Sequence, residues 1–407
     1  MPFFRLKHSF TAGELSPLMN DRIDFDRYRN GCKTLKNMFC VTQGPAIRRP
    51  GLKFVYDLNR IGFDTEVGKI RMIPFIFNEI QAYVMVFYQH EDGGIRMVLA
   101  TTDSKGADGL VLGSGQPCEY DSESSRDWEG DTTLPTDFVF FYPDGASVTA
   151  IEVWHIADAD QARTELTETT DYTVAYDDPA GEATVTVLSN ATTDALEDGR
   201  IYCTLSISVP AILRNEVVTI YLPSDWNLDD FDWAQSGDEM YFAQPDLNPH
   251  IIRRHDHTCW ELVSVTFANQ PKDWSDEYGW PERVTFHQQR LCFGANKLRR
   301  QTIWMSKAGD FGDFGVSSPL LDSDAVTFTL DSGTQNRIQW ISSSKSLHVG
   351  TLGNEWTVDG NDQSALTPDN ILARRQTNSG SEPNKPLMVG ITTLLFQRPV
   401  RTVNEFA

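Results

Sequence analysis

The chain has 407 residues, of which 40% are hydrophobic and 11% aromatic, and its formal net charge is -22 at pH 7. This length exceeds the usual size of one hydrophobic core, so we expect two or three domains. No apolar run approaches the roughly 20 residues of a membrane-spanning helix, and the polar N-terminus lacks the apolar region of a signal peptide, so a soluble protein made in the cytosol is predicted.

The first segment, residues 1–54, is dense in turn-forming residues. Gly13 and Pro17 bracket a turn, and Gly44-Pro45 and Pro50-Gly51 interrupt any long helix. One or two short helical turns are expected between these points. Residues 1–60 contain 11 Lys/Arg against 5 Asp/Glu. Because no aromatic residues suited to base stacking are interleaved with these cations, we favour their pairing with acidic groups of a neighbouring subunit over nucleic-acid binding. The alternative is a polar extension that caps a β domain.

The next segments predict β-structure interrupted by a linker. In residues 55–102, YVMVF and IRMVLA flank the turn at residues 90–94, which predicts a hairpin. Residues 103–131 are rich in Gly, Ser and Asp, and their composition predicts a linker. Residues 132–212 contain β-like runs with tight turns, and we expect an inserted antiparallel β-sandwich there that folds independently.

Residues 213–407 show a degenerate repeat of short strand pairs. Hairpins are predicted at MYFAQ with HIIRR, LCFGA with QTIWMS, LHVGT with EWTV, and LLFQR with TVNEF. Alignment on Phe242, Phe293, Val349 and Phe396 gives spacings of 51, 56 and 47 residues. A period in this range is typical of a β-propeller, and a β-sandwich is the alternative. The predicted fold class is therefore all-β, with a β-propeller-like core, an inserted β-sandwich and an irregular N-terminal arm.

Catalytic and metal-binding patterns are few. His250, His255 and His257 are close in sequence, and a strand would place His255 and His257 on one face, but no second ligand cluster is evident. The pair Asp229-Asp230 is interpreted as a turn rather than a glycosidase pair. Serine-hydrolase, dinucleotide and P-loop motifs are absent from the sequence. Without CxxC spacing, the six cysteines are expected to be reduced, mostly buried thiols. The tryptophans expected to be buried in the repeats are Trp304, Trp340 and Trp356. We therefore predict no catalytic site, no metal site and no cofactor.

Two segments carry a resemblance to known families. The N-terminal arm contains, in order, Phe10, Gly13, Glu14, Leu15, Ser16, Pro17, Arg22, Asp24, Tyr28, Gly31, Leu35, Asn37, Gln43, Gly44, Arg48, Arg49, Pro50 and Gly51. Together with WPERVTFHQQRLCFGA, TIWMSKAGDFGDFG and LHVGTLGNEWTVDG, this order resembles the tail nozzle (tail tubular or knob) proteins of short-tailed bacteriophages, over most of residues 1–100 and 226–407. The run FFYPDGASV with LTETTDYTV resembles the small N-terminal attachment domain of podovirus tail fibres and tailspikes.

These resemblances imply a non-enzymatic virion protein, made in the host cytoplasm. The family forms a ring, with six copies expected, below the head-tail adaptor. The ring provides a channel for genome ejection and a docking surface for fibres or spikes. The arm residues would make the assembly contacts, and duplex DNA would pass without specific binding. Residues 101–240 contain 29 Asp/Glu against 5 Lys/Arg, either as a solvated acidic face or as part of a conduit that repels phosphate. The alternative function is a glycan-binding or glycan-cleaving phage adhesin with a propeller fold. Family members are usually longer.

Overall fold

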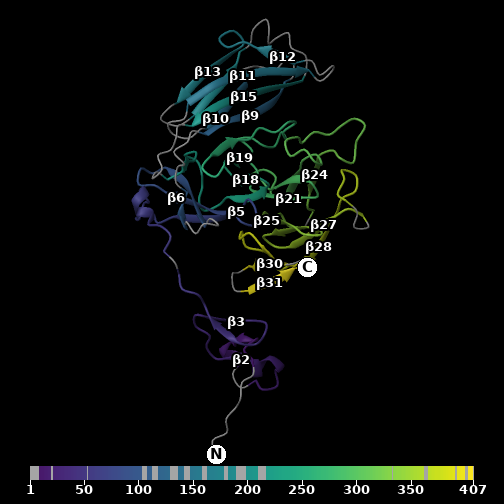
Figure 1. Ribbon diagram of the computed structural model, residues 1–407. Coiled ribbons are helices and arrows are strands. Elements are labelled where there is room, and N and C mark those ends of the chain that lie inside the picture. The colour runs from purple at the N-terminus through teal and green to yellow at the C-terminus, as the bar shows by residue number, and fades with distance from the viewer. Residues whose placement is uncertain are drawn as a thin grey trace, which may run out of the picture. The chain divides into compact units, whose positions relative to one another are not determined.

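The computed structural model is an all-β protein, as predicted (Figure 1). The chain forms two compact units, residues 1–56 and residues 57–407. Among the described residues, no helix is both long and apolar enough to cross a membrane. The structure describes residues 9–19, 22–52, 54–102, 108–111, 118–128, 136–141, 147–157, 163–177, 182–188, 199–209, 217–331, 333–361, 365–389, 392–398 and 402–406.

In its described residues, the first unit consists of two short strand pairs and two 3₁₀ helices. Strands β1 and β2 are parallel, β3 and β4 form an antiparallel hairpin, and both helices lie between β1 and β2 in the chain. The predicted short helical turns are therefore present. The elements are β1 (Gly13–Glu14), η1 (Pro17–Met19), η2 (Asp26–Asn30), β2 (Gly31–Cys32), β3 (Met38–Cys40) and β4 (Ala46–Arg48).

The second unit begins with an antiparallel sheet in the order β16-β7-β6-β5, with β8 also paired to β7. Strand β16 returns to β7 more than 100 residues later in the chain, so the intervening segment is an insertion into this sheet. The predicted hairpin at residues 83–100 is formed by β6 and β7. The elements are η3 (Leu58–Ile61), β5 (Ile70–Ile76), β6 (Ala82–Gln89), β7 (Ile95–Thr102), β8 (Asp108–Leu110) and β16 (Thr219–Tyr221).

Four further sheets follow in chain order, and within each sheet every strand pairs antiparallel with the next. All four predicted hairpins of this region are present. The strands are β17 (Asp232–Ser236), β18 (Glu239–Gln244), β19 (Leu247–Arg254) and β20 (Trp260–Ser264); β21 (Arg283–His287), β22 (Arg290–Gly294), β23 (Thr302–Met305) and β24 (Val326–Thr329); β25 (Ile338–Ser343), β26 (Leu347–Thr351), β27 (Glu355–Asp359) and β28 (Leu372–Thr377); and β29 (Leu387–Val389), β30 (Thr392–Gln397) and β31 (Thr402–Phe406).

The repeat predicted from sequence coincides with this sheet order. Phe242, Phe293, Val349 and Phe396 each lie on the second strand of their sheet, β18, β22, β26 and β30. The first three are buried, whereas Phe396 is exposed. The three tryptophans expected in the repeats, Trp304, Trp340 and Trp356, are all buried. The repeat therefore reflects one structural position that recurs from sheet to sheet.

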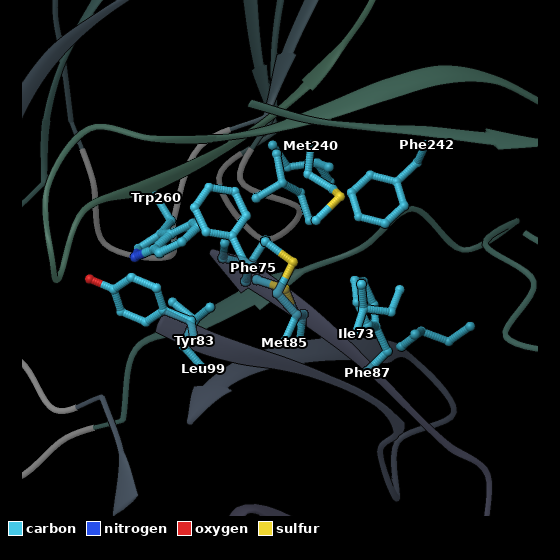
Figure 2. Packing of buried hydrophobic residues seen from close by; sticks show 14 of the residues in the cluster. Ile73, Phe75, Tyr83, Met85, Phe87, Leu99, Met240, Phe242 and Trp260 are labelled. Atoms are coloured by element: carbon cyan, nitrogen blue, oxygen red, sulfur yellow. The ribbon is translucent and has the colours of Figure 1, made fainter. Parts of the chain in front are cut away.

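Adjacent sheets pack face to face through apolar side chains. In the first contact, Phe75 and Tyr83 of the first sheet meet Trp260 on β20, with ring centroids 4.9 and 5.0 Å from the tryptophan (Figure 2). The next sheets meet in the same way, and Trp340 on β25 packs against Leu395 and Phe406 of the last sheet. Burial of each such side chain contributes about 1.5–3 kcal/mol, so these contacts hold the row of sheets together.

The inserted segment forms two facing sheets with a shared apolar core. One sheet has the order β12-β11-β15-β9, and the other contains β13-β14-β10. Strand β10 also pairs with β20 at Phe140↔Val263, so the second sheet continues into β20-β19-β18-β17. The strands are β9 (Cys118–Trp128), β10 (Thr136–Phe141), β11 (Ser147–Ala157), β12 (Arg163–Leu166), β13 (Tyr172–Asp177), β14 (Glu182–Val187) and β15 (Gly199–Val209).

Two expectations are corrected here. The predicted linker at residues 103–131 contains β8 and the long strand β9, which pairs with β15 along its whole length. Backbone pairing along one edge of a sheet does not require an apolar sequence, so the polar composition concealed this strand. Cys259, expected to be a reduced thiol, is disulfide-bonded and is buried in the core of the insertion. Cys32, Cys40, Cys203 and Cys292 are free.

This pairing changes the fragment that should fold alone. We expect residues 118–209 to melt cooperatively with strand-type circular dichroism, because the fragment retains β9 beside β15. Residues 132–212 lack β9 and should melt at a lower temperature, since β15 then keeps β11 but loses its second partner strand along its full length. Thermal melts of both fragments test this. If both are disordered, the insertion depends on β20 of the adjoining sheet.

Candidate functional site

The N-terminal unit gathers most of the predicted arm residues around the β1–β2 pair. The backbone N–H of Phe10 donates to the carbonyl of Gly44 at 2.7 Å, and the N–H of Leu15 donates to the carbonyl of Cys32 at 2.9 Å. Gly13 has φ +67, a conformation that favours glycine. Pro17 begins η1, where its missing N–H costs no helical hydrogen bond. Ser16 lies between these elements, and its hydroxyl accepts from the N–H of Leu18.

Two contacts fix the register of this pair. The Glu14 side chain accepts from the backbone N–H of Leu35 at 2.7 Å. Gly31 faces Leu15 so closely that a Cβ on Gly31 would lie 2.4 Å from Leu15 Cδ1. A side chain at position 31 would therefore displace the Leu15 side chain. From the sequence, Gly31 and Leu35 are recognised only as members of the pattern that resembles the nozzle family. Their contacts with Leu15 and Glu14 are seen only in the structure.

The predicted charged residues of the arm are distributed over its surface. Arg22 and Asp24 form an ion pair at 2.7 Å, and the hydrogen bond from Arg22 lowers the pKa of the Asp24 carboxyl. Arg49 donates to Asn37 Oδ1 at 3.3 Å, which ties the end of the β3–β4 hairpin to the residue before it. Tyr28 lies in η2, with its N–H donating to the carbonyl of Phe25.

The remaining predicted residues, Arg48, Pro50 and Gly51, are exposed at the end of this unit. Arg48 is the last residue of β4 and is the register partner of Met38. The structure therefore brings the first half of the predicted arm together with the β3–β4 hairpin, while Pro50 and Gly51 extend from it toward the second unit along the chain.

The N-terminal unit has no apolar core of its own in its described part. Its only buried residues there are Gly31 and Gly44. Its large apolar side chains are exposed, with Leu18 at 90% and Leu52 at 88%. The others are Ile23, Phe25, Met38, Phe39, Ile47, Phe54 and Val55. A set of apolar side chains this exposed is typical of an interaction surface. Sequence analysis missed these residues because it weighed turns and charges rather than the absence of buried partners.

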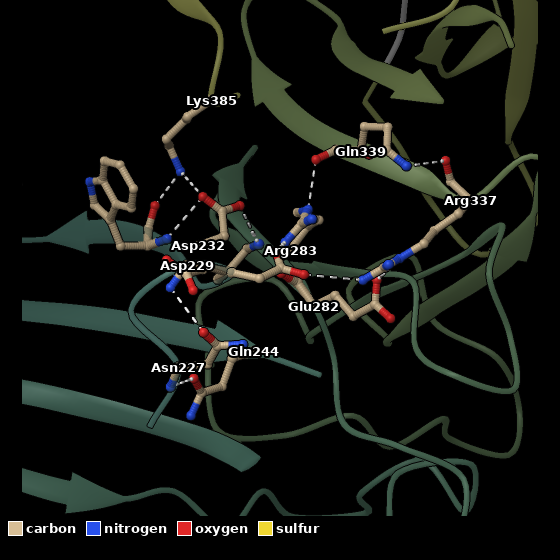
Figure 3. Close-up of polar contacts among 12 residues, drawn as sticks. Asn227, Asp229, Asp232, Gln244, Glu282, Arg283, Arg337, Gln339 and Lys385 are labelled. Carbon is tan, nitrogen blue, oxygen red and sulfur yellow. Dashed lines mark hydrogen bonds and ion pairs between the residues drawn. The ribbon is translucent and has the colours of Figure 1, made fainter. Parts of the chain in front are cut away.

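In residues 57–407, a cluster of polar side chains links the first strands of successive sheets (Figure 3). Asp232 on β17 accepts from the backbone N–H of Val284 on β21 at 3.0 Å. Arg283 on β21 donates to the Gln339 carbonyl on β25 at 2.6 Å. Lys385, just before β29, reaches back to Asp232 at 2.7 Å. These bonds join strands from three sheets and the segment that precedes the fourth, so the cluster is a connection between sheets.

The acids beside this cluster are also engaged. Asp230 accepts from Arg283 at 2.9 Å and Glu282 pairs with Arg337. Burial raises the pKa of the Glu282 carboxyl, against the opposing effect of Arg337. Asp229, considered with Asp230 as a possible glycosidase pair, instead pairs with Lys69 at 2.5 Å. The two neighbouring acids thus serve separate ion pairs to different parts of the fold.

The three histidines considered as metal ligands have separate partners. His250 on β19 is buried, with Nδ1 2.8 Å from the Asn248 carbonyl. His255 and His257 lie in the turn between β19 and β20, where His255 contacts Glu261 and His257 contacts Tyr83. They are not on a strand face, as the sequence argument had supposed. Among the described residues, no group of three or more potential ligands is placed to hold a metal.

Two buried histidines make the stability of the fold depend on pH. Burial lowers the pKa of both His250 and His287 to about 4, whereas the unfolded chain titrates near 6.5. The contribution of these neutral histidines to the free energy of unfolding is fully present above pH 6.5. As the pH falls toward 4, the unfolded state binds more protons than the folded state, and the free energy of unfolding decreases.

Between pH 7 and 4.5 we expect a loss of about 2 kcal/mol for each histidine. Urea unfolding followed by tryptophan fluorescence measures it. In His287→Gln, where an amide can still hydrogen-bond to Ser343 Oγ, the decrease should be smaller than in the unaltered chain. If the free energy of unfolding of this variant falls as much between pH 7 and 4.5 as that of the unaltered chain, His287 does not contribute to the pH dependence.

Comparison with known proteins adds no relative to these observations. No family model matches the chain, and no curated protein matches it significantly.

Proposed function

We propose that this chain is the nozzle subunit of a short-tailed phage tail. It forms a ring below the head-tail adaptor, provides a channel for genome ejection and offers docking surfaces to fibres or spikes. The observation that carries the proposal is the N-terminal unit, which exposes its apolar side chains and has no buried apolar side chain in its described part. A unit of this kind gains its stability from a partner, as expected for an assembly element.

We further propose that residues 57–407 are a β-propeller-like core with a β-sandwich inserted between β8 and β16. Consecutive antiparallel sheets, each packed on the next, support the propeller. The contacts among β17, β21 and β25 support it too, because first strands meet near the axis of a propeller. The facing sheets of the insertion support the sandwich, to which we assign the docking of a fibre or spike.

The polar groups favour a scaffold over an enzyme. The candidate acids Asp229 and Asp230 are engaged in ion pairs between sheets, and the candidate histidines contact separate residues. The net charge of -22 suits a conduit, because an acidic wall gains nothing from counterion release when phosphate passes. Six copies in the ring are expected from the family resemblance.

A phage adhesin is the second candidate, and one surface feature favours it. Trp154 on β11 and Tyr202 on β15 stack at 5.7 Å between ring centroids, with Arg163 4.5 Å from the Trp154 ring. Arg163 also pairs with Glu165. Aromatic faces beside charged groups can bind sugars, although Arg163 here covers one face of the tryptophan. As a soluble protein, an adhesin should bind host polysaccharide and be removed from solution by it. A nozzle should instead sediment with the adaptor and portal proteins.

Removal of residues 1–30 should abolish entry into the tail while leaving a soluble β protein, because the β1–β2 pair is lost and the sheets of residues 57–407 are retained. Co-sedimentation with adaptor and portal measures incorporation. Removal of residues 1–8 is the matched control, since it leaves the β1–β2 pair intact. Normal incorporation of the larger deletion would contradict an assembly role for the arm.

The assembled protein should bind duplex DNA only feebly near 0.15 M salt. Close approach of phosphate to an acidic wall is opposed within a Debye length of about 8 Å, and no counterions are gained. A titration of purified rings with a short duplex measures the affinity. Micromolar or tighter binding with a steep salt dependence would indicate a gripping role instead.

A further inference from the structure

The first sheet of residues 57–407 leaves part of one face exposed, along β5 and the start of β6, whereas Val86, Tyr88 and Val98 on the same face are buried. Ile70, Met72 and Ile76 alternate along β5 and are 43%, 67% and 63% exposed, and Val84 on β6 and Ile80 in the connecting turn are 38% and 70% exposed. We call these five side chains the open face. The residues between them on β5, Ile73 and Phe75, point to the other side and are fully buried (Figure 2).

The rim of the open face carries charged residues of both signs, with Lys69 paired to Asp229 and Arg254 paired to Asp238. Asp229 pairs with Lys69, which directly precedes Ile70, and it remains 64% exposed. At the other end, the Gln235 side chain is hydrogen-bonded to the Ile76 backbone, and Asp238 lies in the turn that follows β17. Glu79, in the β5–β6 turn, is exposed. An apolar centre with a charged rim has the anatomy of a protein interface.

The N-terminal unit has the complementary properties. Phe39 and Ile47 are register partners in the β3–β4 hairpin, so they lie on the same face, and both are exposed. Residues 1–56 contain 10 Lys/Arg and 4 Asp/Glu, whereas residues 57–407 contain 25 and 53. One unit is therefore basic with exposed apolar side chains, and the other is strongly acidic with a partly exposed apolar face.

We propose that the open face binds the N-terminal unit of a second copy of this chain. The inference rests on the proposed ring, because it names the contact between neighbouring subunits. Every copy carries both halves of the contact, so the interaction is heterologous and repeats from copy to copy. Heterologous contacts close into rings when the rotation permits. Attraction between the basic residues 1–56 of one copy and the acidic residues 57–407 of the next offsets the repulsion between copies of net charge -22.

The test uses the full-length chain and measures its mass by sedimentation equilibrium. The open-face variant is M72E/I76E, and the hairpin variant is F39E/I47E. All four positions are exposed, so each variant should keep the circular dichroism and melting temperature of the unaltered chain. V316E, at an exposed position outside both surfaces, is the control. We expect oligomers for the unaltered chain and V316E, and monomers for each double variant alone.

Mixing the two double variants provides the decisive measurement. The hairpin variant retains its open face and the open-face variant retains its N-terminal unit, so one intact contact remains per pair and the mixture should form dimers. The dimers should weaken at least tenfold in affinity between 0.05 and 0.5 M salt. A monomeric unaltered chain, an oligomeric double variant, or a mixture that stays monomeric would each overturn the proposal, the last also indicating that the unit packs on its own chain.

The outcome is separable from that of the proposed function. Chains that oligomerise through this contact but never sediment with adaptor and portal would contradict the nozzle and leave the contact intact. If the unaltered chain enters tails and M72E/I76E has the same oligomeric mass and the same incorporation, the contact is contradicted and the proposed nozzle function is not.

Discussion

The packing of one sheet face on the next is the interaction on which residues 57–407 depend. Each β-strand presents side chains to both sides, so a sheet with apolar residues on both faces must be covered twice. The inner sheets meet this requirement through Trp260, Phe293 and Val349, each buried between neighbours. At the edge strand of the first sheet the requirement is unmet, because Met72 is exposed.

Hydrogen bonds and ion pairs fix the alignment of one sheet relative to the next, which apolar packing alone specifies poorly. Apolar faces can slide, whereas the bonds of Asp232 and Arg283 to backbone groups of neighbouring first strands fix one alignment. Lys385 adds a bond from the last sheet back to β17. Buried charges of this kind add little net stability over an apolar core, but losing one partner leaves the other uncompensated. Removal of any one of these partners should therefore destabilise the packing of the sheets.

The two units of the chain are stabilised by different interactions. Residues 57–407 bury large aromatic and aliphatic side chains, while the described part of residues 1–56 is organised by backbone bonds and close contacts such as Gly31 with Leu15. A segment with few buried apolar contacts has low local stability. In the proposed assembly role, burial of the exposed apolar side chains against a partner would link ordering of this unit to formation of the complex.

Much of the fold of residues 213–407 was readable from local pattern. Hairpins pair neighbouring segments, so alternation and turn residues predicted them, and the spacing of Phe242, Phe293 and Val349 located the second strand of each sheet. Strand β9 was missed because its partner, β15, lies about 80 residues away and its polar sequence carries no strand signal. The continuity of β10 with β20 was missed because the paired residues, Phe140 and Val263, are more than 100 residues apart in the chain.

By itself, the sequence determined the all-β class, the local hairpins, the burial of Trp304, Trp340 and Trp356, and the charge contrast between the arm and the rest of the chain. Only the tertiary structure decided which acids pair with which cations, that Asp229 and Asp230 serve different ion pairs, and which apolar faces remain uncovered. The reason is physical. Periodicity and turn chemistry act between residues close in the chain, whereas coverage of a face and neutralisation of a charge depend on segments that meet only after the sheets have packed.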